Sequence, residues 1–146
     1  MSSKIPATLD KLERILSPVA RVLRVLEGRS LPIDGSTRLP LIALRLSQDR
    51  PGSTVTRDVV VTLPVTIEIA ASSEDETHLD TDLANLLYRV RAALLVADDN
   101  EAFDKLAISG SLQFEAATYG YPEPGSQYAI VQQPISLRIA EHYQED

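Results

Sequence analysis

The stretch that decides the fold runs from Val59 to Ile69 and reads VVVTLPVTIEI. Every odd position in it is apolar, whereas the even positions include Thr62, Thr66 and Glu68. A period of two sustained over this length predicts a β-strand with one buried face. Pro64 falls on the more polar side and cannot donate a backbone hydrogen bond. We therefore expect its position to lie at a sheet edge, at a bulge or at the end of the sheet.

Three further segments have the alternation of strands. Leu41–Leu46 precedes the deciding stretch and is separated from it by a turn at Gln48–Ser53, where Pro51 and Gly52 fall. Two more strands are predicted at Ile108–Ala116 and Tyr128–Ile139. The connection between them, Tyr119–Tyr128, is too long for a tight hairpin turn, so we expect it to protrude.

A helix is predicted near the N-terminus, because leucines and a valine recur at spacings of three and four from Leu9 to Leu26. Thr8 is the expected N-cap. Pro18 is unfavourable inside a helix, so we expect the helix to end near Leu16. Two interpretations of the following residues stay open: a second helix with Pro18 in its first turn, or a strand over Arg21–Leu26.

A second amphipathic helix is predicted after the acidic loop Ser72–Thr77, capped by Asp80 and ending near Val96. Its inner face is an apolar stripe, and its outer face includes Asp82, Asn85 and Arg89. The stripe consists of Leu79, Leu83, Leu86, Leu87, Val90 and Leu94.

Hairpins that alternate with helices predict an α+β fold. We expect one domain over residues 1–146, with a mostly antiparallel sheet of four to five strands and two main helices on one face. We find no internal repeat or linker in the sequence.

Composition excludes several classes of protein. The chain has no cysteine, a formal net charge of -7 and a sequence pI near 4.8, which argue against disulfides, thiolate metal sites and a wide phosphate-binding face. His78 and His142 have no metal-ligand spacing, and no phosphate-binding or serine-hydrolase motif is present. No apolar stretch is long enough for a membrane span, and the N-terminus lacks a signal-peptide pattern. We expect no catalytic residue, cofactor or metal, and a cytosolic origin.

Tyrosines around two prolines and two glycines are the most distinctive local feature. Tyrosine suits an interface because it offers a large contact area at low entropic cost. The alternative is that these rings pack back onto the sheet and close the loop. Arginines outside the loop are further candidates for pairing with acidic loops of a neighbouring subunit. The candidate contact residues are therefore Tyr119, Tyr121, Tyr128, Arg50, Arg89 and Arg91.

From about Leu31 to Tyr143 the order and spacing of these segments resemble the small tail terminator and tail completion proteins of long-tailed phages, the minor tail protein U or Z-like group. The resemblance begins with LPLIAL at residues 39–44 and continues with the long strand Asp58–Ile69. The segment DLANLLYRVRAAL at residues 82–94 is similar to the family pattern D-L-x-x-L-x-x-x-V-R-x-A-L. The final strand and its IAEHY ending at residues 139–143 complete the resemblance.

The resemblance implies a structural protein of the virion, made in the bacterial cytoplasm and placed at the head-proximal end of the tail. Such a protein forms a hexameric ring on the last ring of the tail tube, stops tube polymerisation and presents a surface to a head-completion or connector protein. DNA passes through the ring without specific binding, and neither an enzymatic activity nor a membrane is involved. Two alternatives stay open: a neck or head-to-tail joining protein, and a monomeric α+β binding module or adaptor.

Overall fold

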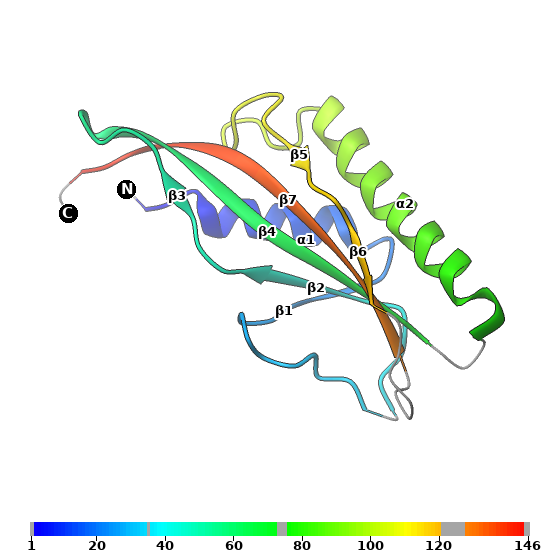
Figure 1. Ribbon diagram of the computed structural model, residues 1–146. Helices are drawn as coiled ribbons and strands as arrows, with labels where there is room; N and C mark the ends of the chain where they lie inside the picture. Colours follow the sequence, from blue (N-terminus) through cyan, green and yellow to red (C-terminus); the bar gives the residue numbers. More distant parts are fainter. Residues whose placement is uncertain (1, 35, 73–75, 121–127, 145–146) are drawn as a thin grey trace.

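A computed structural model describes residues 2–34, 36–72, 76–120 and 128–144. Over these residues the chain forms two α-helices and a seven-stranded, mostly antiparallel sheet (Figure 1), so the predicted α+β class is confirmed. The strand number exceeds the predicted four to five because two short strands, Arg50–Pro51 and Thr118–Gly120, were not predicted. The elements are α1 (Ile5–Leu16), β1 (Arg21–Arg24), β2 (Leu41–Leu46), β3 (Arg50–Pro51), β4 (Asp58–Ser72), a 3-10 helix (Glu76–His78), α2 (Leu79–Asp99), β5 (Gln113–Phe114), β6 (Thr118–Gly120) and β7 (Tyr128–His142).

β4 and β7 form the centre of the sheet. Each is 15 residues long, and they pair from Asp58 opposite His142 to Ser72 opposite Tyr128. β2 pairs with the other side of β4, and β1 runs parallel to β2 at the edge. The predicted strand from Val59 to Ile69 is thus confirmed and extends further at both ends.

Pro64 lies inside β4, at a local interruption of the sheet. β2 pairs with Val65–Ala70 and β3 with Val61–Thr62, so neither of these strands pairs with Leu63 or Pro64. The carbonyl of Val60 faces this side and accepts a hydrogen bond from Gly52 N at 2.8 Å. Backbone groups alternate sides along a strand, so Pro64 faces the same gap, where no ladder bond requires an N–H. Pro64 therefore lies at an edge on one side of β4, where no strand pairs with it. On the other side it pairs with Ser136 of β7, so it is not at the end of the sheet.

Both helices pack on one face of the sheet (Figure 1). This face carries the odd positions of β4, which pair with odd positions of β7. Its fully buried side chains include leucines from both helices and isoleucines from the three long strands, and they form the main core. They are Leu12, Leu16, Ile42, Leu63, Ile67, Ile69, Leu83, Leu94, Ile135, Leu137 and Ile139.

The opposite face is covered at one end by residues 25–34 and 36–39, which we call the strap. Leu31 from the strap packs with Leu41, Ala43 and Ala70 in a second, smaller cluster. Asp34 organises the strap, because its Oδ1 accepts hydrogen bonds from Ser36 N at 2.8 Å and Ser36 Oγ at 2.7 Å. These hydrogen bonds, with a further one from the Thr37 hydroxyl, hold the pKa of Asp34 below its usual range. This cover was not predicted, since its residues show no strand or helix period.

α1 ends at Leu16 as predicted, but its start was predicted wrongly. The helix begins at Ile5, with Pro6 in its first turn, and Ile5 N donates to Ser3 Oγ at 3.1 Å. Thr8 is not the N-cap: it is fully buried, and its hydroxyl donates to Lys4 O at 2.8 Å. After the helix the strand alternative is the correct one, since β1 begins at Arg21; it ends at Arg24, two residues before the predicted end at Leu26.

The bounds of α2 also differ from the prediction. The helix begins at Leu79, so Asp80 lies in its first turn, where its Oδ1 accepts from Thr81 N at 2.9 Å instead of capping the end. It continues three residues past Val96 to Asp99 and ends where Glu101 adopts a positive φ of 59°. Asp98 and Asp99 are therefore the last two residues of the helix.

Two predictions for the connecting segments were wrong. Within Ile108–Ala116 only β5 is a strand, because Gly110 takes a φ of 73° and turns the chain after Ile108. Ile108 still contacts the sheet, since its N–H donates to Arg138 O at 2.8 Å. Conversely, the predicted turn at Gln48–Ser53 contains β3, which pairs with β4.

Candidate interaction surfaces

α2 has an apolar stripe on each of two opposite faces. The inner stripe is buried in the core as predicted, with Leu83, Val90 and Leu94 fully covered. The outer stripe, which we define as Tyr88, Ala92, Leu95 and Val96, was missed. Tyr88 is 73% exposed, Leu95 47% and Val96 59%. The signal in the sequence was that Ala92 follows Tyr88 by four residues and is itself followed by Leu95 and Val96 at three and four residues, which places these side chains on one helix face.

Arg89 and Arg91 flank this stripe but have different surroundings. Arg89 is exposed and lines a cavity of about 390 Å³ between α2 and the end of the strap, together with Asp82, Asn85 and Pro40. Arg91 is half-buried, and its Nε donates to Gln133 Oε1 at 2.8 Å. Arg91 therefore supports the fold of its own subunit.

The buried side chain of Gln133 has hydrogen-bond partners for both its oxygen and its nitrogen. It is fully buried on β7, between α2 and the segment before β6. Besides accepting from Arg91, it donates through Nε2 to Glu115 O and to Pro134 O, both at 2.7 Å. These contacts satisfy the amide and fix the position of α2 on the sheet.

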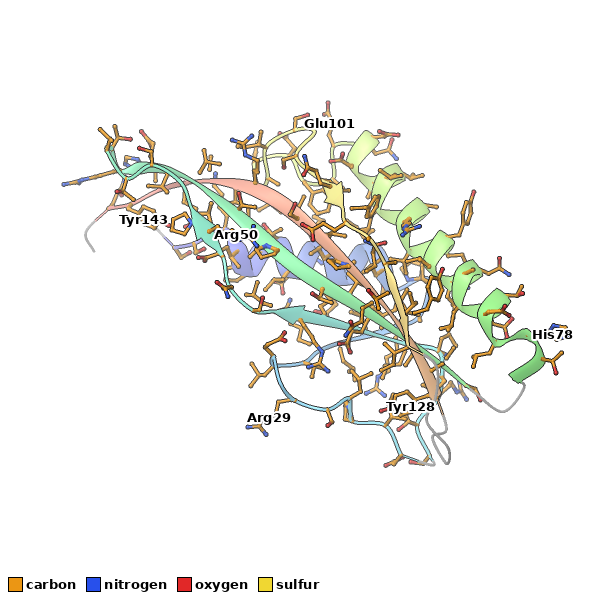
Figure 2. The ribbon with its side chains drawn as sticks, in the orientation of Figure 1. Arg29, Arg50, His78, Glu101, Tyr128 and Tyr143 are labelled. Atoms are coloured by element: carbon orange, nitrogen blue, oxygen red, sulfur yellow. The ribbon has the colours of Figure 1, made fainter. Side chains whose placement is uncertain are left out.

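The tyrosines predicted for contact occupy two environments. Tyr119 lies on β6 opposite Val131, on the face that carries α2, and is 38% exposed. Tyr128 begins β7 and packs against the second cluster beneath the strap (Figure 2). Tyr121 lies outside the described residues. Each interpretation of the loop therefore fits one tyrosine. Tyr119 is exposed and available to a partner, whereas Tyr128 packs back onto the sheet.

We expect Tyr128→Ala to lower the free energy of unfolding by about 1–2 kcal/mol, because it removes a half-buried ring from the second cluster. Tyr119→Ala is the matched control and is expected to change that free energy by less than about 0.5 kcal/mol. Urea denaturation followed by circular dichroism measures both. Equal losses in the two variants would contradict this division of roles.

Arg50 lies on β3, far from Tyr128 along the sheet (Figure 2). β3 leads into residues 52–57, which connect it to β4 and which we call the arm. The arm projects at one end of the sheet (Figure 1), and within it Val55 is 90% exposed. Because no apolar neighbour covers Val55, the arm is a second exposed apolar feature, separate from the outer stripe of α2.

The same end of the sheet brings the segment before α1 and the end of β7 together. Ser3 Oγ donates to Glu141 Oε1 at 2.8 Å, and His142 Nδ1 lies 2.7 Å from Asp58 Oδ1. Desolvation and the carboxylate of Glu141 raise the pKa of Tyr143 above its usual value. These contacts tie the N-terminal segment to β7 and give the arm a fixed base.

A buried ion pair lies where the strap covers the sheet. Arg45 Nε is 2.8 Å from Glu68 Oε1, and both side chains are at most 10% exposed. Gln132 Nε2 donates to the same carboxylate oxygen at 3.0 Å, and Arg45 Nη1 donates to Leu26 O at 2.9 Å. Glu68 was expected on an exposed polar face. Glu68 is buried because the strap covers this face, and Arg45 binds the backbone of the strap at Leu26 O.

Among the described residues, no group of three or more histidine, aspartate or glutamate side chains is placed to hold a metal ion. Neither helix, taken over the same part of the chain, is both long and apolar enough to pass through a bilayer.

Comparisons with known proteins assign no family. No family model matches the chain, and no curated protein matches it. Among the solved structures that match, one aligns over 97% of this chain and 96% of its own chain, at 15% sequence identity and a TM-score of 0.40. The protein in that structure is named only by a sequence identifier, and a similarity of this degree carries no argument about function.

Proposed function

We propose that this chain is a structural protein of a long-tailed phage that caps the tail tube as a ring. In this proposal, copies of the chain bind the last ring of the tube, stop its polymerisation and present a surface for head joining. The protein acts through binding alone, without a cofactor or metal, and is located in the virion at the head-proximal end of the tail.

The observation that carries the proposal is the outer stripe of α2. A surface helix of a monomer needs one apolar face, which here is the inner stripe buried in the core. The outer stripe adds one tyrosine and two branched apolar side chains, and Arg89 lies beside it. Aromatic residues, arginine and aliphatic side chains are the composition of protein interfaces. A second apolar face therefore supports a permanent partner.

Tyr119 extends the same side of the molecule. It projects from the sheet face that carries α2, so the predicted tyrosine and the unpredicted stripe belong to one side. We assign this side to the tail tube. The phage role itself comes from the resemblance in the order of segments, and the stripe supports the assembly that this role requires.

Charge is compatible with a ring through which DNA travels. The net charge is -7, and a ring that held phosphates tightly would slow DNA passage. Since the same total would arise from an acidic outer surface, the charge permits the proposal without carrying it.

The proposal is tested by adding the purified chain to the tail tube protein of the same phage during polymerisation, with tube lengths measured by electron microscopy. We expect the wild-type chain to shorten the tubes in a dose-dependent way. Leu95→Asp should lose this effect, because it places a charge in the outer stripe. Ser109→Asp adds the same charge at an exposed position outside α2, and should keep it. Tubes of unchanged length with the wild-type chain would overturn the proposal.

A further inference from the structure

We infer that Gln133 is a positioning residue for the side of the molecule that carries the outer stripe and Tyr119. Its side-chain amide holds α2 and the segment before β6 at fixed places on β7, so that Tyr119 and the outer stripe meet a partner as one surface. The inference rests on the proposed function for the identity of the partner, the tail tube. It adds which buried residue organises the surface that binds this partner.

The outer edge of β7 has an irregular partner at Gln133. Between β5 and β6 the outer segment has three residues, 115–117, whereas β7 has only Gln133 and Pro134 opposite them. One extra residue on one strand of an antiparallel pair is a β-bulge, which interrupts the ladder of backbone hydrogen bonds. β6, which carries Tyr119, therefore begins just after the regular pairing of β5 has been lost.

Pro134 cannot complete the backbone pairing at the bulge. Glu115 N donates to Pro134 O at 3.0 Å, which is one half of the two-bond exchange of an antiparallel pair. The second bond would need an N–H at residue 134, and proline has none. Gln133 Nε2 donates to Glu115 O at 2.7 Å, so the side-chain amide takes the place of the missing backbone donor.

The oxygen of the same amide binds the helix. Gln133 Oε1 accepts a hydrogen bond from Arg91 Nε at 2.8 Å. Arg91 follows Tyr88 by three residues and precedes Leu95 by four, so its side chain leaves α2 beside two members of the outer stripe. One fully buried amide therefore connects the helix that carries the stripe with the segment that leads into β6.

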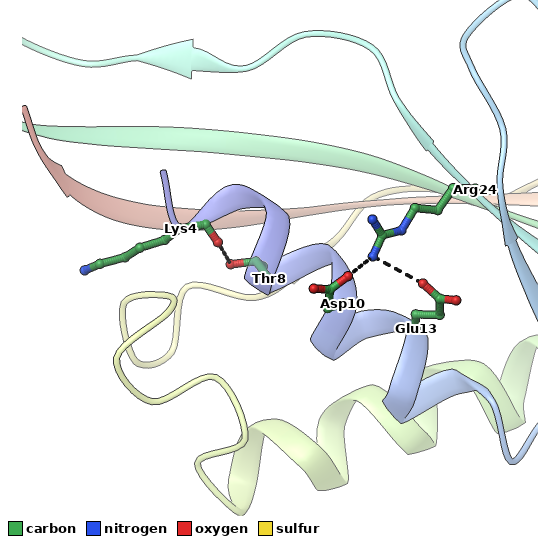
Figure 3. A network of polar contacts seen from close by, with 5 residues as sticks. All are labelled: Lys4, Thr8, Asp10, Glu13 and Arg24. Atoms are coloured by element: carbon green, nitrogen blue, oxygen red, sulfur yellow. Dashed lines mark hydrogen bonds and ion pairs between the residues drawn. The ribbon is translucent and has the colours of Figure 1, made fainter. Parts of the chain in front are cut away.

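Burial makes this connection strong. Gln133 is fully buried, so a broken hydrogen bond would leave polar groups that water cannot reach, which is costly. The ion pairs of Arg24 with Asp10 and Glu13 differ, because they lie at the surface (Figure 3), where water replaces a lost partner. The buried amide is therefore better suited than such surface pairs to hold two elements at one distance.

Hydrogen exchange followed by mass spectrometry tests the link to β6. Gln133→Met keeps most of the side-chain volume and removes the amide, so we expect residues 113–120 to exchange about tenfold faster than in the wild type. Exchange of β4 should stay unchanged, which shows that the variant is folded. Adding Pro134→Ala to Gln133→Met restores an N–H opposite Glu115 and should return residues 113–120 to within about threefold of the wild-type rate. A residue that only fills space would not be rescued by Pro134→Ala.

Tube shortening tests the consequence for binding. We expect Gln133→Met to need about tenfold more protein than the wild type for the same shortening, because Tyr119 is no longer held beside the outer stripe. Tyr119→Ala should weaken the wild-type chain but add little to Gln133→Met, since the contact of the tyrosine is already lost in that background.

The outcomes separate this inference from the capping proposal. Wild-type exchange of residues 113–120 in Gln133→Met, or no rescue by Pro134→Ala, would overturn the positioning role and leave the capping proposal in place. Faster exchange in Gln133→Met together with wild-type tube shortening would also overturn the positioning role. The expected exchange rates, combined with a wild-type chain that does not shorten tubes, would overturn the capping proposal and support the link that Gln133 makes.

Discussion

The Glu68→Ala variant is expected to lose about 3–5 kcal/mol of its free energy of unfolding. Glu68 is 5% exposed and Arg45 is 9% exposed, so removal of the carboxylate leaves a buried guanidinium without its counter-charge. Gln132 loses its acceptor at the same time. The cost of the substitution is therefore the desolvation of a charge that no longer has a partner, added to the lost packing.

The control replaces both charges. Arg45→Met combined with Glu68→Leu fills a similar volume with apolar atoms and is expected to restore most of the lost stability. Chemical denaturation monitored by circular dichroism gives the free energies of all variants. A Glu68→Ala variant within about 1 kcal/mol of wild type would show that the pair is more hydrated than its burial indicates.

Adjacent leucines on α2 give the second large effect. Leu94→Ala is expected to lower the free energy of unfolding by about 2–5 kcal/mol, because Leu94 is fully buried in the core and its truncation leaves a cavity. Leu95→Ala removes the same atoms from a side chain that is 47% exposed on the outer stripe, and should cost less than about 1 kcal/mol.

The two variants should also separate in activity. Leu95→Ala is expected to be stable yet weaker in stopping tube growth, whereas Leu94→Ala is destabilised throughout the subunit. Thermal melts and tube lengths, measured on the same preparations, check both statements. Similar stability losses for the two leucines would contradict the assignment of an inner and an outer stripe.

The sheet could be predicted well from the sequence where one face is buried over a long strand. Val59–Ile69 and Leu41–Leu46 have a clear period of two, and both are strands. The short strands β3, β5 and β6 have two or three residues each, too few to show a period. Their pairing is decided by contact with β4 and β7, which is information from distant parts of the chain.

Burial on the second face could not be predicted, because the strap has no regular period. Glu68 occupies an even position of β4, where alternation predicts exposure, and it is buried on the face that the strap covers. Arg45 on β2 lies on the same face and is likewise buried. Local alternation identifies the face on which a residue lies, but not what covers that face.

The contact residues were predicted in part. Tyr119 and Arg89 are exposed on or near the α2 side, whereas Tyr128 packs under the strap and Arg91 binds Gln133. The outer stripe could not be separated from ordinary surface residues in the sequence, because the inner stripe alone already satisfies the pattern of an amphipathic helix.

The central claim is that this chain ends tail-tube growth, and tail lengths in its absence test it most directly. Phage particles that encode the chain would be assembled with its gene interrupted, and the tails would be measured by electron microscopy. We predict tails of irregular and excessive length that do not join filled heads, with normal length restored when the wild-type chain is supplied. Tails of uniform length joined to filled heads without the chain would contradict it.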